Sequence, residues 1–225
     1  MVNETPNIKT TRLLLRPFRQ SDAPALFRYA SDPNVGPSAA WNAHTSVEES
    51  REVIRTVFAQ PLTWAITLRE PLDLNGRTAT SDSAVINEEN WIIPERVKAG
   101  EAIGAIGLSP IDPQDSELAE AGSGESGTDP SKRREIGYWV GRPLWGRGIA
   151  TEAAHAVIDF GFRTVGLESI WGRHNVTNVA SDHVMRACGM RFVRLAKHCW
   201  MDLIKEYRDE DVLCLTRGQW EKDNG

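Results

Sequence analysis

The feature that most constrains the fold is a glycine-rich turn between a short apolar strand and a long amphipathic helix. The predicted strand covers residues 135–140, and the predicted helix runs from Ile149 to about Phe162. Small and apolar residues recur along the helix at the spacing of a single face, so this face can pack tightly on a sheet. A strand, a two-glycine turn and a helix in this order predict an α/β layer with a binding turn at its edge.

The turn has the composition of a phosphate site. Its residues are Trp145, Gly146, Arg147, Gly148, Ile149, Ala150 and Thr151. Two glycines allow the backbone to bend closely. The first N–H groups of a helix lack partners, and the helix dipole adds about half a positive charge at this end. The side chain of Arg147 adds a full positive charge to the turn. The pattern therefore favours binding of a pyrophosphate. A merely tight connection is the alternative interpretation.

Two other nucleotide-binding turns fit these residues less well. The dinucleotide pattern G-x-G-x-x-G needs a third glycine where Thr151 stands, and its strand comes too late in this chain. The P-loop pattern G-x-x-x-x-G-K-[ST] does not occur in the sequence. A Rossmann-type nucleotide enzyme therefore stays the weaker alternative.

The rest of the chain predicts a mixed α/β layered fold. Hydrophobic patterns place further strands at 12–18, 63–68, 101–108, 169–173, 191–195 and 212–216. Capping residues predict helices that begin near Ser21 or Asp22, near Thr45 and at Val179. We expect a single domain over residues 1–225, with insertions at about 70–99 and 112–133.

Composition argues against several classes of protein. The net charge of −5 gives no basic surface for nucleic acid or an anionic membrane. No apolar run approaches the roughly 20 residues that span a bilayer, and residues 1–11 contain no signal-peptide core. We therefore expect a cytoplasmic protein with neither nucleic acid nor a membrane as partner. Three cysteines without CxxC spacing, and histidines without metal-ligand spacing, lead us to expect reduced thiols and no metal.

Residues 135–141, followed by Trp145 to Ala153, resemble the cofactor-binding motif of the GNAT superfamily of N-acetyltransferases. The best match is the subgroup that resembles RimJ and RimL, which acetylate ribosomal-protein N-termini. Residues 11–18, Asn178 with Ser181, and the run 188–190 also match this subgroup. The resemblance implies a mostly antiparallel, twisted central sheet of about seven strands, with helices on both faces and a splay between the fourth and fifth strands.

The resemblance also implies acetyl-CoA as cosubstrate. The pantetheine arm would lie in the splay along the fourth strand, and the pyrophosphate would lie on the turn. The implied cofactor-binding residues are Trp139, Val140, Gly141, Trp145, Gly146, Arg147, Gly148, Ile149, Ala150, Thr151, Asn175 and Asn178.

The catalytic residues are less clearly marked. Many superfamily members carry a tyrosine acid where this chain has Met185, and methionine cannot donate a proton. Resemblance to the RimL-like subgroup implies that Ser181 bonds the leaving sulfur, although a serine in the first helical turn can also bond only backbone. Glu135 is the first candidate for the general base, with Asp202 and Glu206 as alternatives.

The implied reaction is direct transfer of an acetyl group to a primary amine, either a peptide N-terminus or a small amine. Residues 34–44 and 202–211 would line the acceptor site, and Trp41 and Trp91 would lie near it. Carboxylates in the second segment would favour a cationic amine. Either a monomer or a homodimer fits. The alternative from another class is a catalytically silent coenzyme A-binding regulatory protein, because Met185 leaves the acid open.

Overall fold

The computed structural model describes residues 4–74, 84–86, 92–111 and 129–224. Trp91 and most of the second predicted insertion, residues 112–128, lie outside these ranges. The described elements follow the predicted order of a strand, two helices, a three-strand meander, a helix, a strand, a helix and two strands. The mixed α/β fold expected from the sequence is confirmed.

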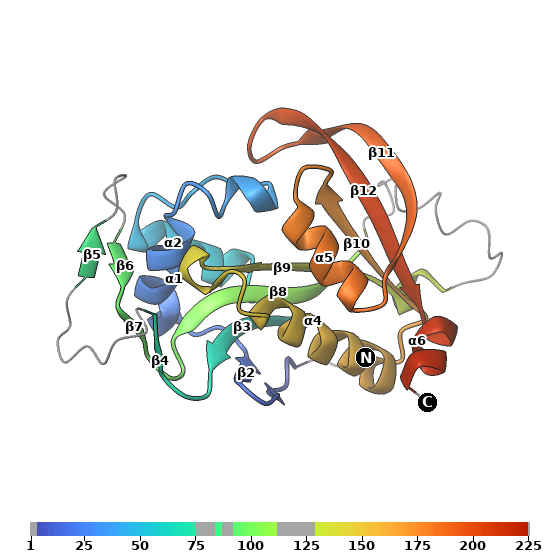
Figure 1. Ribbon diagram of the computed structural model, residues 1–225, viewed down its shortest axis with the longest axis horizontal. Coiled ribbons are helices and arrows are strands. Elements are labelled where there is room, and N and C mark those ends of the chain that lie inside the picture. Colours follow the sequence, from blue (N-terminus) through green and yellow to red (C-terminus); the bar gives the residue numbers. More distant parts are fainter. Residues whose placement is uncertain (1–3, 75–83, 87–91, 112–128, 225) are drawn as a thin grey trace.

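An eight-stranded sheet forms the centre of the molecule, in the order β1-β2-β3-β8-β9-β10-β12-β11 (Figure 1). Its strands are β1 (Ile8–Lys9), β2 (Leu13–Arg16), β3 (Thr63–Leu68), β8 (Ala102–Pro110), β9 (Arg133–Val140), β10 (Ser169–Asn175), β11 (Arg191–Met201) and β12 (Glu206–Thr216). All neighbours in this sheet are antiparallel except the parallel pair of β9 and β10. The eighth strand, beyond the expected seven, is the two-residue β1.

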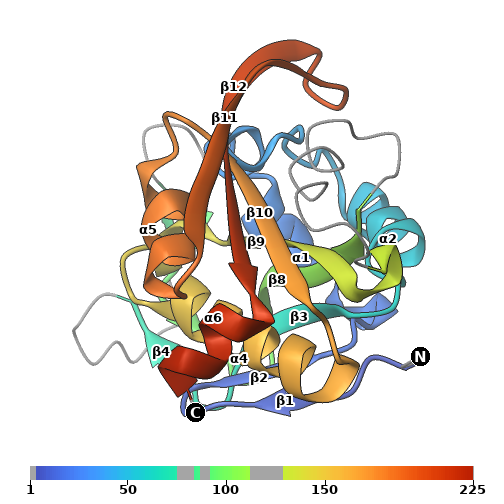
Figure 2. The same cartoon turned by 90° about the vertical axis from the view of Figure 1, so that its right-hand side faces the viewer.

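Helices cover both faces of the sheet (Figure 2). One face carries α1 (Ala23–Ala30) and α2 (Val47–Thr56), and the other carries α4 (Ile149–Phe160) and α5 (Val179–Ala187). The small-residue face predicted for α4 is buried, because Ala153 and Val157 are 0% exposed in the main core. A smaller core lies under α1 and α2 and contains Leu26 and Ile54.

The sheet splits where β9 and β10 part. These strands pair only from Arg133, opposite Ser169, to Glu135, opposite Trp171. Five further residues of β9 and four of β10 continue without pairing to each other. The predicted splay between the fourth and fifth main strands is therefore confirmed, and it opens toward the end of β9 that leads into the turn.

The last hairpin is longer than predicted. Strands expected at 191–195 and 212–216 continue to Met201 and back from Glu206, and Figure 2 shows this extension projecting past the body of the sheet. The alternation of apolar and polar residues fails there because a bulge interrupts β11 between Ala196 and Cys199. The following helix α6 (Arg217–Asn224) was not predicted either, since Trp220 is its one buried residue.

The first predicted insertion contains short strand pairs. They are β4 (Leu72–Asp73) with β7 (Arg96–Val97), and β5 (Ala84–Ile86) with β6 (Ile92–Pro94). The described helices include none with the length and apolar character that a membrane crossing requires.

Candidate active site

The turn between β9 and α4 presents backbone donors at a helix start. Gly146 and Gly148 have φ angles of 70° and 71°, which glycine adopts without strain. Glu152 makes the first bond inside α4, to the carbonyl of Gly148. The N–H groups of residues 148–151 precede this bond and have no partner within the helix. Together with the exposed Arg147, these donors can hold an anionic group.

The segment that connects β1 and β2 holds this turn through hydrogen bonds and an ion pair. Arg12 donates from Nη1 to the carbonyl of Arg147 at 2.8 Å, and its Nε contacts Glu152 Oε2 at 2.6 Å. Glu152 Oε1 accepts from Thr10 Oγ1 at 2.6 Å and from the Arg12 N–H at 2.8 Å. A cavity of about 260 Å³ beside the turn is bordered by Arg12, Arg69 and Arg147, which add positive charge there.

Trp145 fastens the turn to the end of β9. Its indole Nε1 donates to the Val140 carbonyl at 2.6 Å, while 47% of the side chain stays exposed. Gly141 donates its N–H to Ile103 of β8. Because backbone groups alternate sides along a strand, Val140 then faces the splay and Trp139 faces β8, opposite Ala105. Of Trp139, Val140 and Gly141, it is therefore Val140 whose backbone N–H and C=O groups point toward the gap.

Ser181 and Tyr138 meet across the splay. The Tyr138 phenol lies 3.0 Å from Ser181 Oγ and 3.1 Å from the Ser181 carbonyl. Burial raises the pKa of Tyr138 above its usual range, so the phenol stays protonated. Met185 is buried on the same helix and is 3% exposed. Sequence reasoning missed Tyr138, although it stands in the motif strand, because nothing in the pattern shows which helix it reaches.

The two asparagines serve local structure. Asn178 caps α5 by accepting from the Ser181 N–H at 3.1 Å, and its amide donates to the Ser38 carbonyl at 3.0 Å. Asn175 Oδ1 accepts from the N–H and the hydroxyl of Thr177. Both residues lie at the open end of β10, so they border the predicted pantetheine path, and cofactor contact stays a prediction.

Glu135 is held by an arginine of the neighbouring strand. Arg173 Nε and Nη2 contact the two carboxylate oxygens at 3.0 and 3.1 Å. Glu135 is the last residue of β9 that pairs with β10, and Arg173 lies two residues beyond the last paired residue of β10, so the ion pair lies where the splay begins. A proton from an amine must compete with this guanidinium for the carboxylate, so the geometry adds no support to Glu135 as general base.

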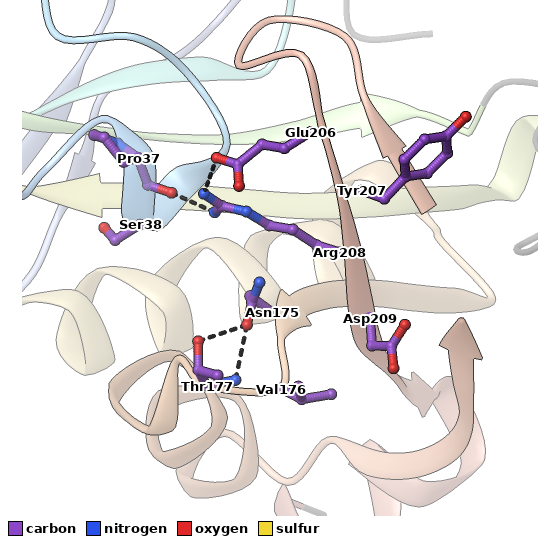
Figure 3. A pocket seen from close by; sticks show the side chains of 9 residues that line it. All are labelled: Pro37, Ser38, Asn175, Val176, Thr177, Glu206, Tyr207, Arg208 and Asp209. Carbon is purple, nitrogen blue, oxygen red and sulfur yellow. Dashed lines mark hydrogen bonds and ion pairs between the residues drawn. The ribbon is translucent and has the colours of Figure 1, made fainter. Parts of the chain in front are cut away.

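A second cavity, of about 670 Å³, lies between three chain segments at the open end of β10. Its lining residues are Pro37, Ser38, Asn175, Val176, Thr177, Glu206, Tyr207, Arg208 and Asp209. Figure 3 shows Glu206 and Arg208 directed toward Pro37 and Ser38, and Tyr207 and Asp209 directed to the other side of β12. Two of the three segments, residues 37–38 and 206–209, fall within the ranges predicted to line an acceptor site, whereas residues 175–177 were not predicted to line it. Trp41, also expected near the acceptor site, does not line this cavity and packs on β9, with its ring centroid 5.4 Å from that of Trp139.

The carboxylates of residues 202–211 are divided among different contacts. Glu206 and Asp209 line the cavity, where Arg208 Nη2 contacts Glu206 at 2.8 Å. Asp202 instead pairs with Lys205 at the hairpin tip, and hydrogen bonding and charge from this lysine lower the pKa of Asp202. Glu210 is buried beside Arg173. Of the five carboxylates in this segment, only Glu206 and Asp209 therefore border the cavity, and Arg208 balances the charge of Glu206.

A polar cluster lies beneath α5. Ligand atoms of His174, Asp182 and Asp211 lie within 4.8 Å of one another. Asp182, however, accepts from Arg186 Nε at 2.7 and 2.9 Å, which already balances its charge. We interpret the cluster as a fastening between α5 and the sheet, and the expectation of no metal stays a prediction.

Comparison with known proteins agrees with this geometry. The family of acetyltransferase (GNAT) domains matches residues 12–191. The "Uncharacterized N-acetyltransferase p20" of Bacillus licheniformis is 29% identical over 172 residues, which cover 76% of this chain and 75% of that protein.

Solved structures share the fold. A protein of Vibrio cholerae, provisionally described as a ribosomal-protein-serine acetyltransferase, has a TM-score of 0.60 and 18% identity, covering 94% of this chain and 99% of that one. The Microcin C7 self immunity acetyltransferase MccE, solved with acetyl-CoA and AMP, has a TM-score of 0.63 and 16% identity, covering 92% and 93%. With its split sheet, its donor-rich turn and a family match over most of its length, this chain belongs to the GNAT family of acetyltransferases.

Proposed function

We propose that this protein transfers the acetyl group of acetyl-CoA directly to a primary amine. The proposal rests on one observation: the splay between β9 and β10 opens directly toward the turn that begins α4. In this arrangement the splay would hold the extended pantetheine arm, and the adjoining turn would hold the pyrophosphate to which the arm is joined. GNAT acetyltransferases use acetyl-CoA, which supplies the acetyl group as a reactive thioester.

Each part of this surface has a distinct task in the proposal. Residues 145–151 hold the pyrophosphate through backbone N–H groups, with Arg147 as an added charge. Backbone groups of β9 that face the splay bond the arm, and the N–H groups among them, that of Val140 included, stabilise negative charge on the carbonyl oxygen of the acetyl group. Ser181 donates a hydrogen bond to the leaving sulfur. Asn175 and Asn178 border the arm.

The cavity between residues 37–38 and β12 is the proposed entrance for the amine. Glu206 and Asp209 contribute two negative charges to its lining and Arg208 one positive charge, and this net negative charge favours a cationic group. Deprotonating an α-amine of pKa near 7.8 at pH 7 costs about 1.1 kcal/mol, whereas a lysine amine of pKa 10.4 costs about 4.6 kcal/mol. Because Arg173 holds Glu135, an α-amine or a small amine of low pKa is the acceptor class that this site serves best.

The likeness to the Vibrio cholerae protein and the resemblance to the RimJ and RimL subgroup support a peptide N-terminus as one such acceptor. We further propose that residues 1–225 form one domain. The described strand pairs of the first insertion form two small sheets of their own, separate from the main sheet.

Thiol release from acetyl-CoA tests the proposal. The wild-type protein should release free coenzyme A only when an amine is present, with one acetylated amine formed for each thiol. A panel of peptides with free N-termini, polyamines and neutral amines identifies the acceptor class. Tight binding of coenzyme A without release for any amine would favour a silent coenzyme A-binding regulator instead.

A further inference from the structure

The contact between Tyr138 and Ser181 bridges two elements that no strand pairing joins. Tyr138 lies three residues beyond Glu135, the last residue of β9 that pairs with β10. Its phenol oxygen nevertheless reaches α5 and lies 3.0 Å from Ser181 Oγ. The phenol therefore stands over the splay, next to the one hydroxyl that the proposed function assigns to the leaving sulfur.

No other described side chain nearby on α5 supplies a comparable donor. Met185 carries no proton to donate. At the end of the helix, burial raises the pKa of the Cys188 thiol to about 12. Both side chains pack in the main core. Tyr138 is thus the described phenol that contacts Ser181, and it comes from β9, on the opposite wall of the gap.

The direction of the hydrogen bond decides what Ser181 can do. The phenol has one hydrogen and two neighbouring acceptors, Ser181 Oγ and the Ser181 carbonyl. If the phenol donates to the carbonyl, the serine hydrogen can turn back to the phenol oxygen. If the phenol donates to Oγ, the serine hydrogen points elsewhere, and a donor whose oxygen accepts a hydrogen bond is itself a stronger donor.

We propose that Tyr138 is a positioning residue, which donates to Ser181 Oγ and so directs the serine hydrogen to the departing sulfur. A negative sulfur selects this arrangement because it is the better acceptor for the serine hydroxyl. The inference rests on the proposed function, since it needs Ser181 beside the sulfur.

Neither hydroxyl loses its proton in the net reaction. The amine nitrogen forms the new bond to the acetyl carbon, the carbon–sulfur bond breaks, and the sulfur keeps the bonding electron pair. The proton that the nitrogen gives up balances the one that the sulfur takes. Tyr138 and Ser181 therefore act through hydrogen bonds alone, and no further reactant is required.

A titration of bound coenzyme A tests the pair without any turnover. The thiolate absorbs in the ultraviolet, so its pKa follows from a difference titration against protein loaded with desulfo-coenzyme A. Tyr138→Phe and Ser181→Ala should each raise the pKa of the bound thiol by roughly one unit, a tenfold weaker preference for the thiolate. Tyr29→Phe is the matched control, because it removes a buried phenol oxygen that bonds Glu101 at 3.0 Å and leaves the ring in place against Gly141.

Kinetics separate positioning from general damage. Tyr138→Phe should lower kcat about tenfold, the effect of one lost hydrogen bond, with the KM for acetyl-CoA unchanged. In the double variant with Ser181→Ala the losses should not multiply, because each change breaks the same chain of hydrogen bonds. Independent multiplication of the losses, or a wild-type thiol pKa in Tyr138→Phe, overturns the inference.

The two proposals fail in different ways. If the wild-type protein lowers the pKa of the bound thiol through both residues but acetylates no amine, the proposed acetyl transfer is wrong and the positioning role of Tyr138 is supported. If the wild type acetylates amines while Tyr138→Phe equals wild type in thiol pKa and kcat, the pairing falls and the transfer function stands.

Discussion

Ser181 contributes its backbone to the helix and its hydroxyl to the splay, and these contributions are separable. Its N–H is capped by Asn178, and its carbonyl lies 3.1 Å from the Tyr138 phenol oxygen. Ser181→Ala leaves both contacts in place, so the free energy of unfolding should fall by at most about 1 kcal/mol. The same change should lower kcat about tenfold or more, because the hydroxyl at the leaving sulfur is lost.

Urea unfolding and steady-state kinetics on one preparation measure both quantities. Ser46→Ala is a control that should change stability but not catalysis, because Ser46 Oγ caps α2 and lies 3.0 Å from the Glu49 nitrogen. It should cost about 1 kcal/mol of stability and leave kcat unchanged. A Ser181→Ala protein with wild-type kcat would reduce Ser181 to a structural residue.

Single residues were predictable where their partners are close in sequence. Ser181 and Asn178 stand three positions apart, so the helix cap that joins them follows from local spacing. Tyr138 is separated from Ser181 by 43 positions and Glu135 from Arg173 by 38. Those contacts depend on how far two strands run together before they part, which no local pattern encodes. The sequence therefore suggested Glu135 as a base without showing the arginine that holds it.

At the scale of elements, Glu152 joins the first strands to α4, and this contact should depend on pH. Burial raises the pKa of Glu152, but hydrogen bonds from Thr10 and Arg12 and the charge of Arg12 together lower it below its usual value. A lowered folded-state pKa stabilises the protein above the unfolded pKa of about 4.3, and this stabilisation is lost as pH falls through the folded value.

Glu152→Gln should accordingly lower Tm at neutral pH. The difference in Tm from wild type should shrink as pH falls below about 4, where the wild-type carboxylate also becomes neutral. Thermal unfolding followed by circular dichroism at several pH values measures this difference. A gap that stays constant down to acid pH contradicts the assigned ion pair with Arg12.

The last hairpin should tune acceptor affinity through charge. Glu206 and Asp209 line the cavity, and exposed charges are screened beyond about 8 to 10 Å at physiological salt. The KM of a cationic acceptor should therefore rise with ionic strength. The pair Glu206→Gln and Asp209→Asn should raise KM at low salt and flatten its salt dependence.

Two substitutions on α2 match the change in net charge at a distance from the cavity. Glu48→Gln with Glu52→Gln removes two exposed carboxylates and should leave KM and its salt dependence unchanged. If the preferred acceptor has a KM indifferent to salt, the carboxylates of the hairpin serve only the solubility of the surface.

Over the whole molecule, strong local patterns fixed the fold class in advance. The apolar face of α4 and the glycine turn predicted a strand, a binding turn and a buried helix, and the described core contains them. The extension of β11 and β12 was missed because strands that project from the body bury neither face and need no alternation. Two of the three cavity walls came from predicted segments, but the third, residues 175–177, and the division of five carboxylates among separate partners required the folded structure.

Coenzyme A affinity at position 148 tests the central claim, that the turn before α4 holds the cofactor. Asparagine and aspartate both tolerate the positive φ of this residue, and a Cβ there meets only the Arg12 side chain, at 3.5 Å. Gly148→Asn and Gly148→Asp therefore differ in charge at nearly equal shape. By calorimetry, Gly148→Asp should bind coenzyme A at least about tenfold more weakly than Gly148→Asn, a cost of about 1.4 kcal/mol. Equal affinity of these two variants would contradict a pyrophosphate at this turn.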